Sequence, residues 1–267
     1  MDLFNTKNKI LLKELIEVDF KLRYQGSVIG HFWSILKPIM MFSIMYAVFV
    51  RFLKFGEGIP HFAVALLLGT TVFNFFAEAT GMGMSSVVNR GDLMRKISFS
   101  KPVIVLSVVA NAGINFLINL AVVLIFAVIN GVQFNVGIFM IPLLLLELVI
   151  LVVGISFILA TVFVYFRDLA PVWEVFVQLF MYATPIIYPL SMVFNMGHPK
   201  AAKLLMLNPL AQIIQDMRYF MIEHNNTPIW QILSWKYAWI PYIIPFFVLG
   251  FGIWIFNKHS KSFAEVV

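Results

Sequence analysis

The amino-acid sequence predicts an all-α integral membrane protein with six transmembrane helices. Of its 267 residues, 61% are hydrophobic and only 12% are charged, which is too little charge for the surface of a water-soluble domain of this size. Apolar runs of about twenty residues recur, and an α-helix needs a run of that length to cross the hydrocarbon core of a bilayer. The runs are continuous rather than alternating, which argues against the strands of a membrane β-barrel.

Six apolar runs are expected to span the membrane, and the whole chain, residues 1–267, is interpreted as one transmembrane domain. The runs are Phe32–Phe52, His61–Thr80, Pro102–Asn130, Ile138–Tyr165, Val172–Phe194 and Tyr237–Phe256. The third and fourth are longer than a bilayer requires, so we expect them to tilt or protrude. Pro185 and Pro189 predict that the fifth helix is broken before it leaves the membrane, because proline lacks the N–H that a helix needs.

The distribution of Lys and Arg predicts cytoplasmic N- and C-termini, since cytoplasmic segments carry an excess of these residues. With the N-terminus inside, the outer segments hold few of the 19 Lys and Arg residues, namely Arg51, Lys54, Lys200, Lys203, Arg218 and Lys236. The first thirty residues also lack the short apolar core of a signal peptide, so we expect no removable signal.

An amphipathic interfacial helix is expected before the first span, over residues 9–23. Leu11, Leu15, Val18 and Leu22 share one helical face, and charged residues fall on the opposite face. A helix of this kind lies along the cytoplasmic membrane surface. It is either a simple anchor or an element that also packs on a cytoplasmic partner.

The stretch "NRGDLMRKISFSKP", residues 89–102, is a polar island between the second and third spans. It holds Arg90, Arg95, Lys96 and Lys101 but only one acid, Asp92. It is either a solvated cytoplasmic loop or a short helix that enters a groove of a partner through Leu93 and Met94. Asp92 is expected to cap the start of that helix.

The outer segment before the last span is predicted to contain re-entrant helices. Asn208 is expected as the N-cap of one helix and Pro209 as its first residue, and apolar residues follow at helical spacing. We expect this helix to dip into the outer leaflet or to lie on it. A segment that dips must have its backbone covered by protein or a cavity.

Polar residues inside the spans are costly in lipid and therefore face protein or water. Asn111, Asn115 and Asn119 recur every four residues in the third span and form one stripe. Glu147 lies at a similar depth in the fourth span, and we expect it to hydrogen-bond Asn119 or Asn115. The pair either stabilises the helix packing or lines a conduit.

Several kinds of chemistry are absent from the sequence. There is no Cys, no GxxxxGK[ST] phosphate loop, no HExxH motif, no His cluster and no nucleophile elbow. We therefore expect no catalytic residues, no metal site and no ATP binding by that loop. A nucleic-acid role would need a soluble basic face, and none is present.

Five stretches in this order resemble the permease subunit of type-2 ATP-binding-cassette exporters. They are "RYQGSVIGHFWSILKP" (23–38), "NRGDLMRKISFSKP" (89–102), "VYFRDLAPVWE" (164–174), "TPIIYP" (184–189) and "NPL" (208–210). The resemblance covers nearly the whole chain and is strongest to the polysaccharide branch, which exports O-antigen, teichoic acid or cell-wall rhamnan. Many members have an aromatic residue directly before the proline of this stretch, whereas this chain has Lys101 before Pro102.

The resemblance implies a homodimer of permeases with two copies of a separate ATPase, which binds ATP and Mg while this chain carries no cofactor. It implies a gate helix in region 1–31, a coupling-helix region at 81–101 and an extracytoplasmic re-entrant region at 195–236. The coupling residues that contact the ATPase would be Asp92, Leu93, Met94, Arg95 and Lys96.

The resemblance also implies a path for the substrate, which is a glycan linked through pyrophosphate to undecaprenol. Membrane lipid is expected as a further contact of the protein. Gate residues would be Trp33, Lys37, Arg167 and Asp168, although Arg167 and Asp168 could equally be an anchor and a helix N-cap. Exit residues would be Tyr188, Asn208 and Pro209. A drug or another lipid is the alternative cargo, and an ion-coupled carrier has only Glu147 in its favour.

Overall fold

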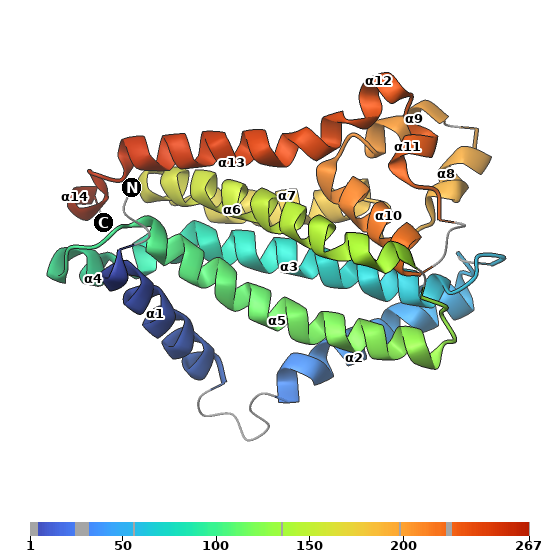
Figure 1. Ribbon diagram of the computed structural model, residues 1–267, viewed down its shortest axis with the longest axis horizontal. Helices are drawn as coiled ribbons and strands as arrows, with labels where there is room; N and C mark the ends of the chain where they lie inside the picture. The colour runs from blue at the N-terminus through green and yellow to red at the C-terminus, as the bar shows by residue number, and fades with distance from the viewer. Residues whose placement is uncertain are drawn as a thin grey trace.

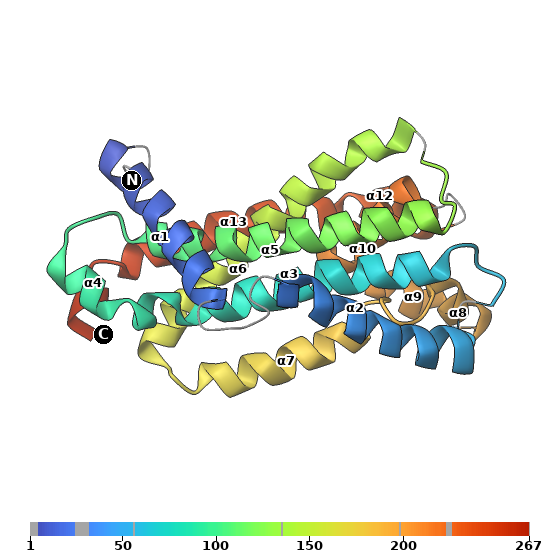
Figure 2. The same cartoon turned by 90° about the horizontal axis from the view of Figure 1, so that it is seen from below.

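The computed structural model describes residues 5–24, 32–55, 57–134, 136–197, 199–222 and 226–266, and the regular structure in these ranges is helical throughout. The long helices run side by side along the long axis of the molecule (Figure 1). We call one end of this bundle the α4 end, after the short helix α4 (Gly91–Lys96), and the other the α10 end, after α10 (Pro209–Met221). Both chain termini lie at the α4 end (Figures 1 and 2).

Within the described residues, four helices are long and apolar enough to cross a membrane. They are α3 (Phe62–Asn89), α5 (Pro102–Ile129), α6 (Ile141–Tyr165) with the preceding 3₁₀ turn η3 (Val136–Met140), and α13 (Ile240–His259) with the preceding α12 (Trp235–Ala238). At 1.5 Å per residue, α3 and α5 are each roughly 40 Å long, which exceeds the roughly 30 Å hydrocarbon core. These two helices therefore extend beyond the bilayer.

The helix α3 occupies the centre of the bundle and α13 its edge. In the most apolar window of each helix, 78% of the residues of α3 are buried, against 22% for α13. The core therefore consists of α3 with the faces of α5 and α6 that pack on it. The exposed apolar faces of α5, α6 and α13 match a lipid environment.

Two glycines bring α6 and α13 into backbone contact. A Cβ atom on Gly154 of α6 would lie 2.6 Å from the Leu249 nitrogen, and one on Gly252 of α13 would lie 2.4 Å from the Gly154 carbonyl oxygen. Small residues at such crossings allow close packing of membrane helices, where lipid supplies no hydrophobic driving force.

The helices of the first predicted span, Phe32–Phe52, cover almost all of it, whereas the helix of the fifth, predicted over Val172–Phe194, ends earlier than expected. The first contains α2 (Trp33–Met45) and a π-helical continuation, η2 (Tyr46–Phe52), while the fifth is α7 (Leu169–Ala183), of 15 residues. The helix α7 ends before Thr184–Pro185, as the prolines predicted. It is attached to α3 by aromatic contacts of Phe76 with Trp173 and Phe180, at ring centroid distances of 6.3 and 5.6 Å.

The second predicted span ended too early, at Thr80. Helix α3 continues to Asn89, so residues 81–89 of the region 81–101 belong to its last turns. The glycines at 81 and 83 do not end the helix. A Cβ on Gly83 would lie 2.7 Å from the Ser156 side chain, so close packing on α6 uses this glycine.

Five short helices form the α10 end. They are α8 (Leu190–Asn195), α9 (Pro199–Leu205), α10, α11 (Ile229–Ile232) and α12. The helix α10 is buried among α3, α6 and α13, and it also contributes to a small second core with α8, α9 and α11. Its polar residues find partners inside the bundle, and its predicted place in or on the outer leaflet stays a prediction.

Candidate functional site

The helix α4 projects from the α4 end of the bundle (Figure 1). Its Asp92 side chain is 90% exposed and approaches Arg95 at 4.0 Å. Asp92 was expected to cap the helix, but the N-cap position is Arg90 and no side chain caps it by a hydrogen bond. Asp92 lies in the first turn, where a negative charge still interacts favourably with the helix dipole.

Met94 was predicted to contact a partner, but it is buried in this protein. Its side chain is only 8% exposed and belongs to the main core, and Leu93 is half-buried. The exposed surface of this segment is instead charged and polar, with one apolar residue. It consists of Asp92, Arg95, Lys96, Ile97 and Ser98.

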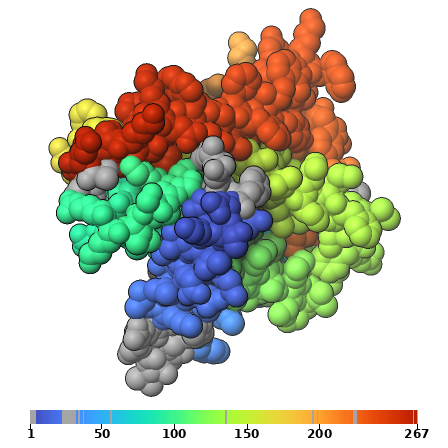
Figure 3. Space-filling model, turned by 60° about the vertical axis from the view of Figure 1, so that its left-hand side comes forward, coloured from blue at the N-terminus to red at the C-terminus, as the bar shows by residue number. Residues whose placement is uncertain are grey.

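The helix α1 (Thr6–Tyr24) braces the α4 segment from one side (Figure 3). Asp19 of α1 forms an ion pair with Arg90, which also donates a 2.7 Å hydrogen bond to Ser107 of α5. Asn8 accepts a 3.3 Å hydrogen bond from the Ser100 backbone. The predicted helix at 9–23 is therefore confirmed.

The predicted apolar face of α1 is only partly covered by the protein. Leu11 and Leu15 are half-buried, whereas Val18 and Leu22 are exposed. Asp19 points toward Arg90 instead. An exposed apolar strip on α1 therefore remains for the membrane surface or a partner.

The C-terminal segment braces α4 from the other side. The Nζ of Lys101 donates a hydrogen bond to the Ser260 carbonyl, and α14 (Phe263–Val266) packs against α4. Burial lowers the pKa of Lys101, and the nearby Glu265 carboxylate opposes part of this effect. Phe263 is fully buried, with its ring 5.2 Å from that of Phe256.

The four predicted gate residues lie on two separate parts of the chain. Trp33 is at the start of α2 and is exposed, and Lys37 is in α2 with a side chain outside the described part of the structure. Arg167 and Asp168 are exposed in the turn between α6 and α7. Arg167 lies over the Phe163 ring at 5.5 Å, and Asp168 occupies the N-cap position of α7 without a side-chain capping bond.

A pocket of about 440 Å³ lies where α1, α3 and α5 meet. Arg90 and Asp19 line it together with Ser85, Ser86 and Asn111. Asn111 is 2% exposed, and its Oδ1 has no hydrogen-bond donor among the described residues. The polar stripe expected on α5 therefore borders this pocket at Asn111.

The predicted pairing of Glu147 with Asn119 or Asn115 is wrong. Asn119 donates a 2.9 Å hydrogen bond to the Asn115 carbonyl of its own helix. Glu147 lies beside Gln212 and Asp216 of α10. The reason is that α10 inserts against α6, which sequence spacing could not indicate.

The start of α10 was predicted correctly. Asn208 accepts a 2.9 Å hydrogen bond from the Leu210 backbone, and Pro209 is the first helical residue. The Asn208 amide also donates to Thr184 at 3.1 Å, and Tyr188 donates to the Tyr182 carbonyl at 3.0 Å. The three predicted exit residues thus lie around the turn at 184–189.

The helix α10 carries two further polar clusters that the sequence analysis missed. Asp216 accepts from Gln212 at 2.9 Å and from Tyr242 of α13 at 2.5 Å. Arg218 donates to the carbonyl oxygens of Ala65, Pro185 and Ile186 at 3.1, 2.7 and 2.8 Å. The available signal was the polar set in "NPLAQIIQDMRYFM", since charges in an apolar helix need partners.

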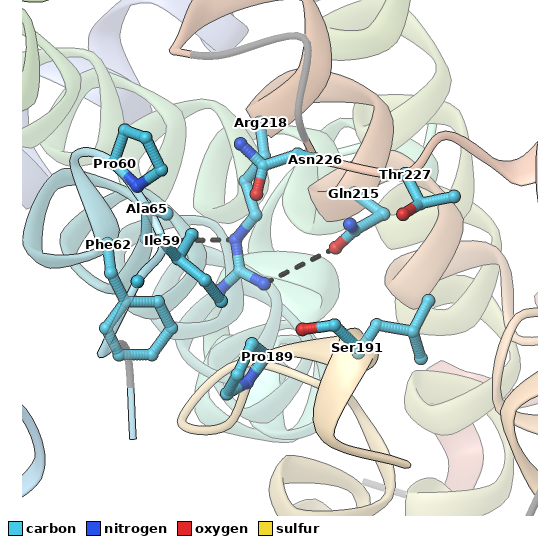
Figure 4. A pocket seen from close by; sticks show the side chains of 12 residues that line it. Ile59, Pro60, Phe62, Ala65, Pro189, Ser191, Gln215, Arg218, Asn226 and Thr227 are labelled. Atoms are coloured by element: carbon cyan, nitrogen blue, oxygen red, sulfur yellow. Dashed lines mark hydrogen bonds between the residues drawn. The ribbon is translucent and has the colours of Figure 1, made fainter. Parts of the chain in front are cut away.

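Arg218 lines a pocket of about 240 Å³ at the α10 end, which we call the Arg218 pocket. The other lining residues come from the start of α3, the start of α8 and the chain around Asn226 and Thr227. Figure 4 shows the guanidinium among the side chains of Gln215, Ser191 and Pro189. The polar lining residues are Ser191, Gln215, Arg218, Asn226 and Thr227.

This geometry defines a helical, multi-pass membrane protein with a cationic, braced segment at one end and a buried polar helix at the other. The ABC-2 type transporter family profile matches residues 10–222. The chain therefore belongs to the ABC-2 type transporter family. It is a transporter permease of a bacterial cytoplasmic membrane rather than an enzyme itself.

Its relatives cover it almost from end to end. An O-antigen export system permease protein RfbA of Klebsiella pneumoniae is 30% identical over 258 residues, which are 96% of this chain and 95% of the relative. A protein of the same name from Myxococcus xanthus is 28% identical over 218 residues, which are 80% of this chain and 81% of the relative. The chain is thus similar to permeases of one export system.

Proposed function

We propose that this chain is the permease of an ATP-driven exporter that moves lipid-linked cell-surface polysaccharide across the cytoplasmic membrane. The observation that carries the proposal is the similarity to O-antigen export permeases, which extends over 96% of the chain. The alternative cargoes, a drug or another lipid, are not favoured by these relatives. Teichoic acid remains within the proposed class of polymers.

The proposal places the α4 end in the cytoplasm, with both chain termini. Arg90, Arg95, Lys96 and Lys101 gather at this end, and the positive-inside rule favours such a placement. In this topology α2 with η2 and α7 complete six spans with the four long helices. The buried α10 would then be a re-entrant helix of the outer half of the membrane.

Membership of the family supports a proposal for the partners. We propose a homodimer with two copies of an ATPase subunit, which binds ATP and Mg, and a substrate linked to undecaprenyl pyrophosphate. The exposed residues of α4 would contact the ATPase, with braces from α1 and α14 on either side. A gate role of Trp33, Lys37, Arg167 and Asp168 and an exit role of the turn at 184–189 are parts of the same proposal.

Co-purification with a co-expressed candidate ATPase subunit tests the proposal. Arg95→Glu with Lys96→Glu reverses the exposed charge of α4 without touching the buried Met94, so the fold should be kept. We expect the ATPase to be lost and export of the polymer to stop. The matched control is Lys200→Glu with Lys203→Glu, which makes the same change at exposed positions of α9 at the other end.

Two outcomes contradict the proposal. One is retention of the ATPase and of export by the α4 variant. The other is full transport by this polypeptide reconstituted without a second subunit. Loss of the ATPase in the α9 control would show that charge reversal acts non-specifically.

A further inference from the structure

The guanidinium of Arg218 is a buried positive charge without a carboxylate partner among the described residues. Its side chain is 2% exposed, and it lies within 4.0 Å of no described Asp or Glu. Three neutral backbone carbonyls and the Gln215 amide are its hydrogen-bond acceptors. A buried charge is costly unless a counter-charge compensates it, so an anion at this place would be stabilised.

The weakest of these hydrogen bonds points toward the pocket. The Nη1 of Arg218 is 3.4 Å from Oε1 of Gln215. The hydrogen bonds that Nε, Nη1 and Nη2 donate to the three carbonyl oxygens are shorter, at 2.7 to 3.1 Å. A distance of 3.4 Å is beyond the usual N–H···O range. The close-up shows Gln215, which lines the pocket, at the end of this long bond (Figure 4). An anionic oxygen in the pocket could therefore replace the Gln215 oxygen.

The remaining lining favours an anion attached to an apolar molecule. Among the described lining residues, none is acidic, and Ser191 and Thr227 offer hydroxyl donors. Ile59, Pro60 and Phe62 form an apolar wall next to them. Arginine with hydroxyl groups is a common combination for phosphate. Because Nε and Nη2 donate to backbone carbonyls, Nη1 is the guanidinium donor that faces the phosphate.

We propose that the Arg218 pocket binds the phosphate of a lipid head group at the α10 end of the transporter. The phosphate accepts from Nη1 of Arg218 and from the Ser191 and Thr227 hydroxyls, and it takes the place of the Gln215 oxygen. The apolar wall contacts the first part of the lipid chain. The inference concerns binding by this chain alone and does not depend on which polymer is exported.

Thermal unfolding of the purified protein in detergent, with added probes, tests the proposal. The probes are geranylgeranyl diphosphate, geranylgeraniol and inorganic pyrophosphate. A ligand of the native state raises the unfolding temperature. We expect a concentration-dependent rise with the diphosphate lipid and none with the alcohol.

The probes also identify the source of the phosphate. Saturation by pyrophosphate at concentrations as low as those of the lipid would assign the pocket to free phosphate and overturn the lipid part of the proposal. A rise with geranylgeraniol equal to that with the diphosphate would overturn the phosphate site altogether.

A single substitution in the pocket separates binding from folding. Gln215→Glu places a carboxylate beside Nη1, so the protein supplies its own counter-charge and the fold is retained. We expect the affinity for geranylgeranyl diphosphate to fall roughly tenfold or more, because a charge-assisted hydrogen bond contributes on this scale. The unfolding temperature without ligand should stay at or above that of the wild type.

The matched control is Gln133→Glu, the same change at an exposed position in the loop between α5 and α6. It should bind the diphosphate lipid like the wild type. Wild-type affinity in Gln215→Glu, or an equal loss in Gln133→Glu, would overturn the site. This outcome is independent of the ATPase test, since neither glutamine lies on α4.

Discussion

The hydroxyl of Tyr242 on α13 donates a 2.5 Å hydrogen bond to Oδ2 of Asp216 on α10. Asp216 also accepts from Gln212 at 2.9 Å and from the Ile229 backbone at 3.3 Å, which suits an ionised carboxylate. By contrast, Oε1 of Glu147 and Oε1 of Gln212 are buried acceptors without a donor among the described residues. A proton on Glu147 would supply a donor, so Asp216 carries the charge of this cluster and Glu147 is neutral.

This assignment predicts different effects for two similar substitutions. Asp216→Asn removes the negative charge and leaves a single carbonyl oxygen for the three donors, so it should destabilise the protein by about 1.5–3 kcal/mol. Glu147→Gln replaces a neutral acid by a neutral amide of the same shape and should change the unfolding temperature little. The measurement is thermal unfolding in detergent, with the exposed Asp92→Asn as control. Equal destabilisation by the two changes would show that the charges are assigned incorrectly.

The backbone contact between α6 and α13 predicts a large effect of one methyl group. Gly252→Ala would place a Cβ 2.4 Å from the Gly154 carbonyl oxygen, and the helices must separate. Overpacking of this kind costs about 1–3 kcal/mol. Gly250→Ala lies on the same helix with nothing within 4 Å of its Cβ, so it should be neutral or stabilising. Similar unfolding temperatures of the two variants would contradict the close crossing.

Local signals in the sequence were sufficient to predict the apolar helices and the start of α10. Asn208 and Pro209 act through their own backbone geometry, and hydropathy reports on lipid directly. Helix α3 continues through Gly81 and Gly83, beyond the predicted end of the span at Thr80, and Gly83 packs on Ser156 of α6. The packing of α3 on α6 outweighs the low helix propensity of glycine at these positions.

Partners of buried polar residues were beyond the reach of sequence spacing. Depth along the chain suggested Asn119 for Glu147, but the neighbour is Gln212, which is 65 positions further along the chain and reaches α6 only because α10 turns back into the bundle. Arg218 and Asp216 were visible as charges in an apolar helix. Their acceptors and donors come from α3, α13 and the turn at 184–189, so only the folded structure identifies them.

Burial in the α4 segment predicts that its apolar residues have separate roles. Met94→Ala removes a core side chain and should cost about 2–5 kcal/mol of stability. Ile97→Ala changes a side chain that is 45% exposed, so it should leave stability unchanged and weaken ATPase binding. Unfolding temperature and ATPase co-purification measure the two effects. A stable Met94→Ala variant that fails to bind the ATPase would restore Met94 as a contact residue.

The ion pair of Asp19 with Arg90 predicts that α1 loosens when it is broken. Asp19→Ala leaves the partly buried Arg90 without its carboxylate, and hydrogen exchange of the amides in α1 should rise. Glu17→Ala breaks only the exposed pair with Lys13 at 3.8 Å, a type of pair that contributes little. The comparison by hydrogen–deuterium exchange mass spectrometry should show protection lost in the first variant alone. Equal exchange in both would mean that packing on α5, rather than the ion pair, holds α1.

The fully buried Phe263 predicts a mechanical role for the C-terminal segment. It joins α14 to the end of α13 through Phe256, and α14 in turn contacts α4. A movement of α4 can therefore reach α13 through this contact.

Phe263→Ala removes a core aromatic, a change that costs about 3–5 kcal/mol where the site cannot collapse, and it should free α14 locally. We expect the ATPase to remain bound while export of the polymer falls, whereas Val266→Ala at an exposed position of α14 should have no effect. Normal export by Phe263→Ala would exclude this contact as a route of coupling, and loss of the ATPase would show that α14 instead maintains the docking surface itself.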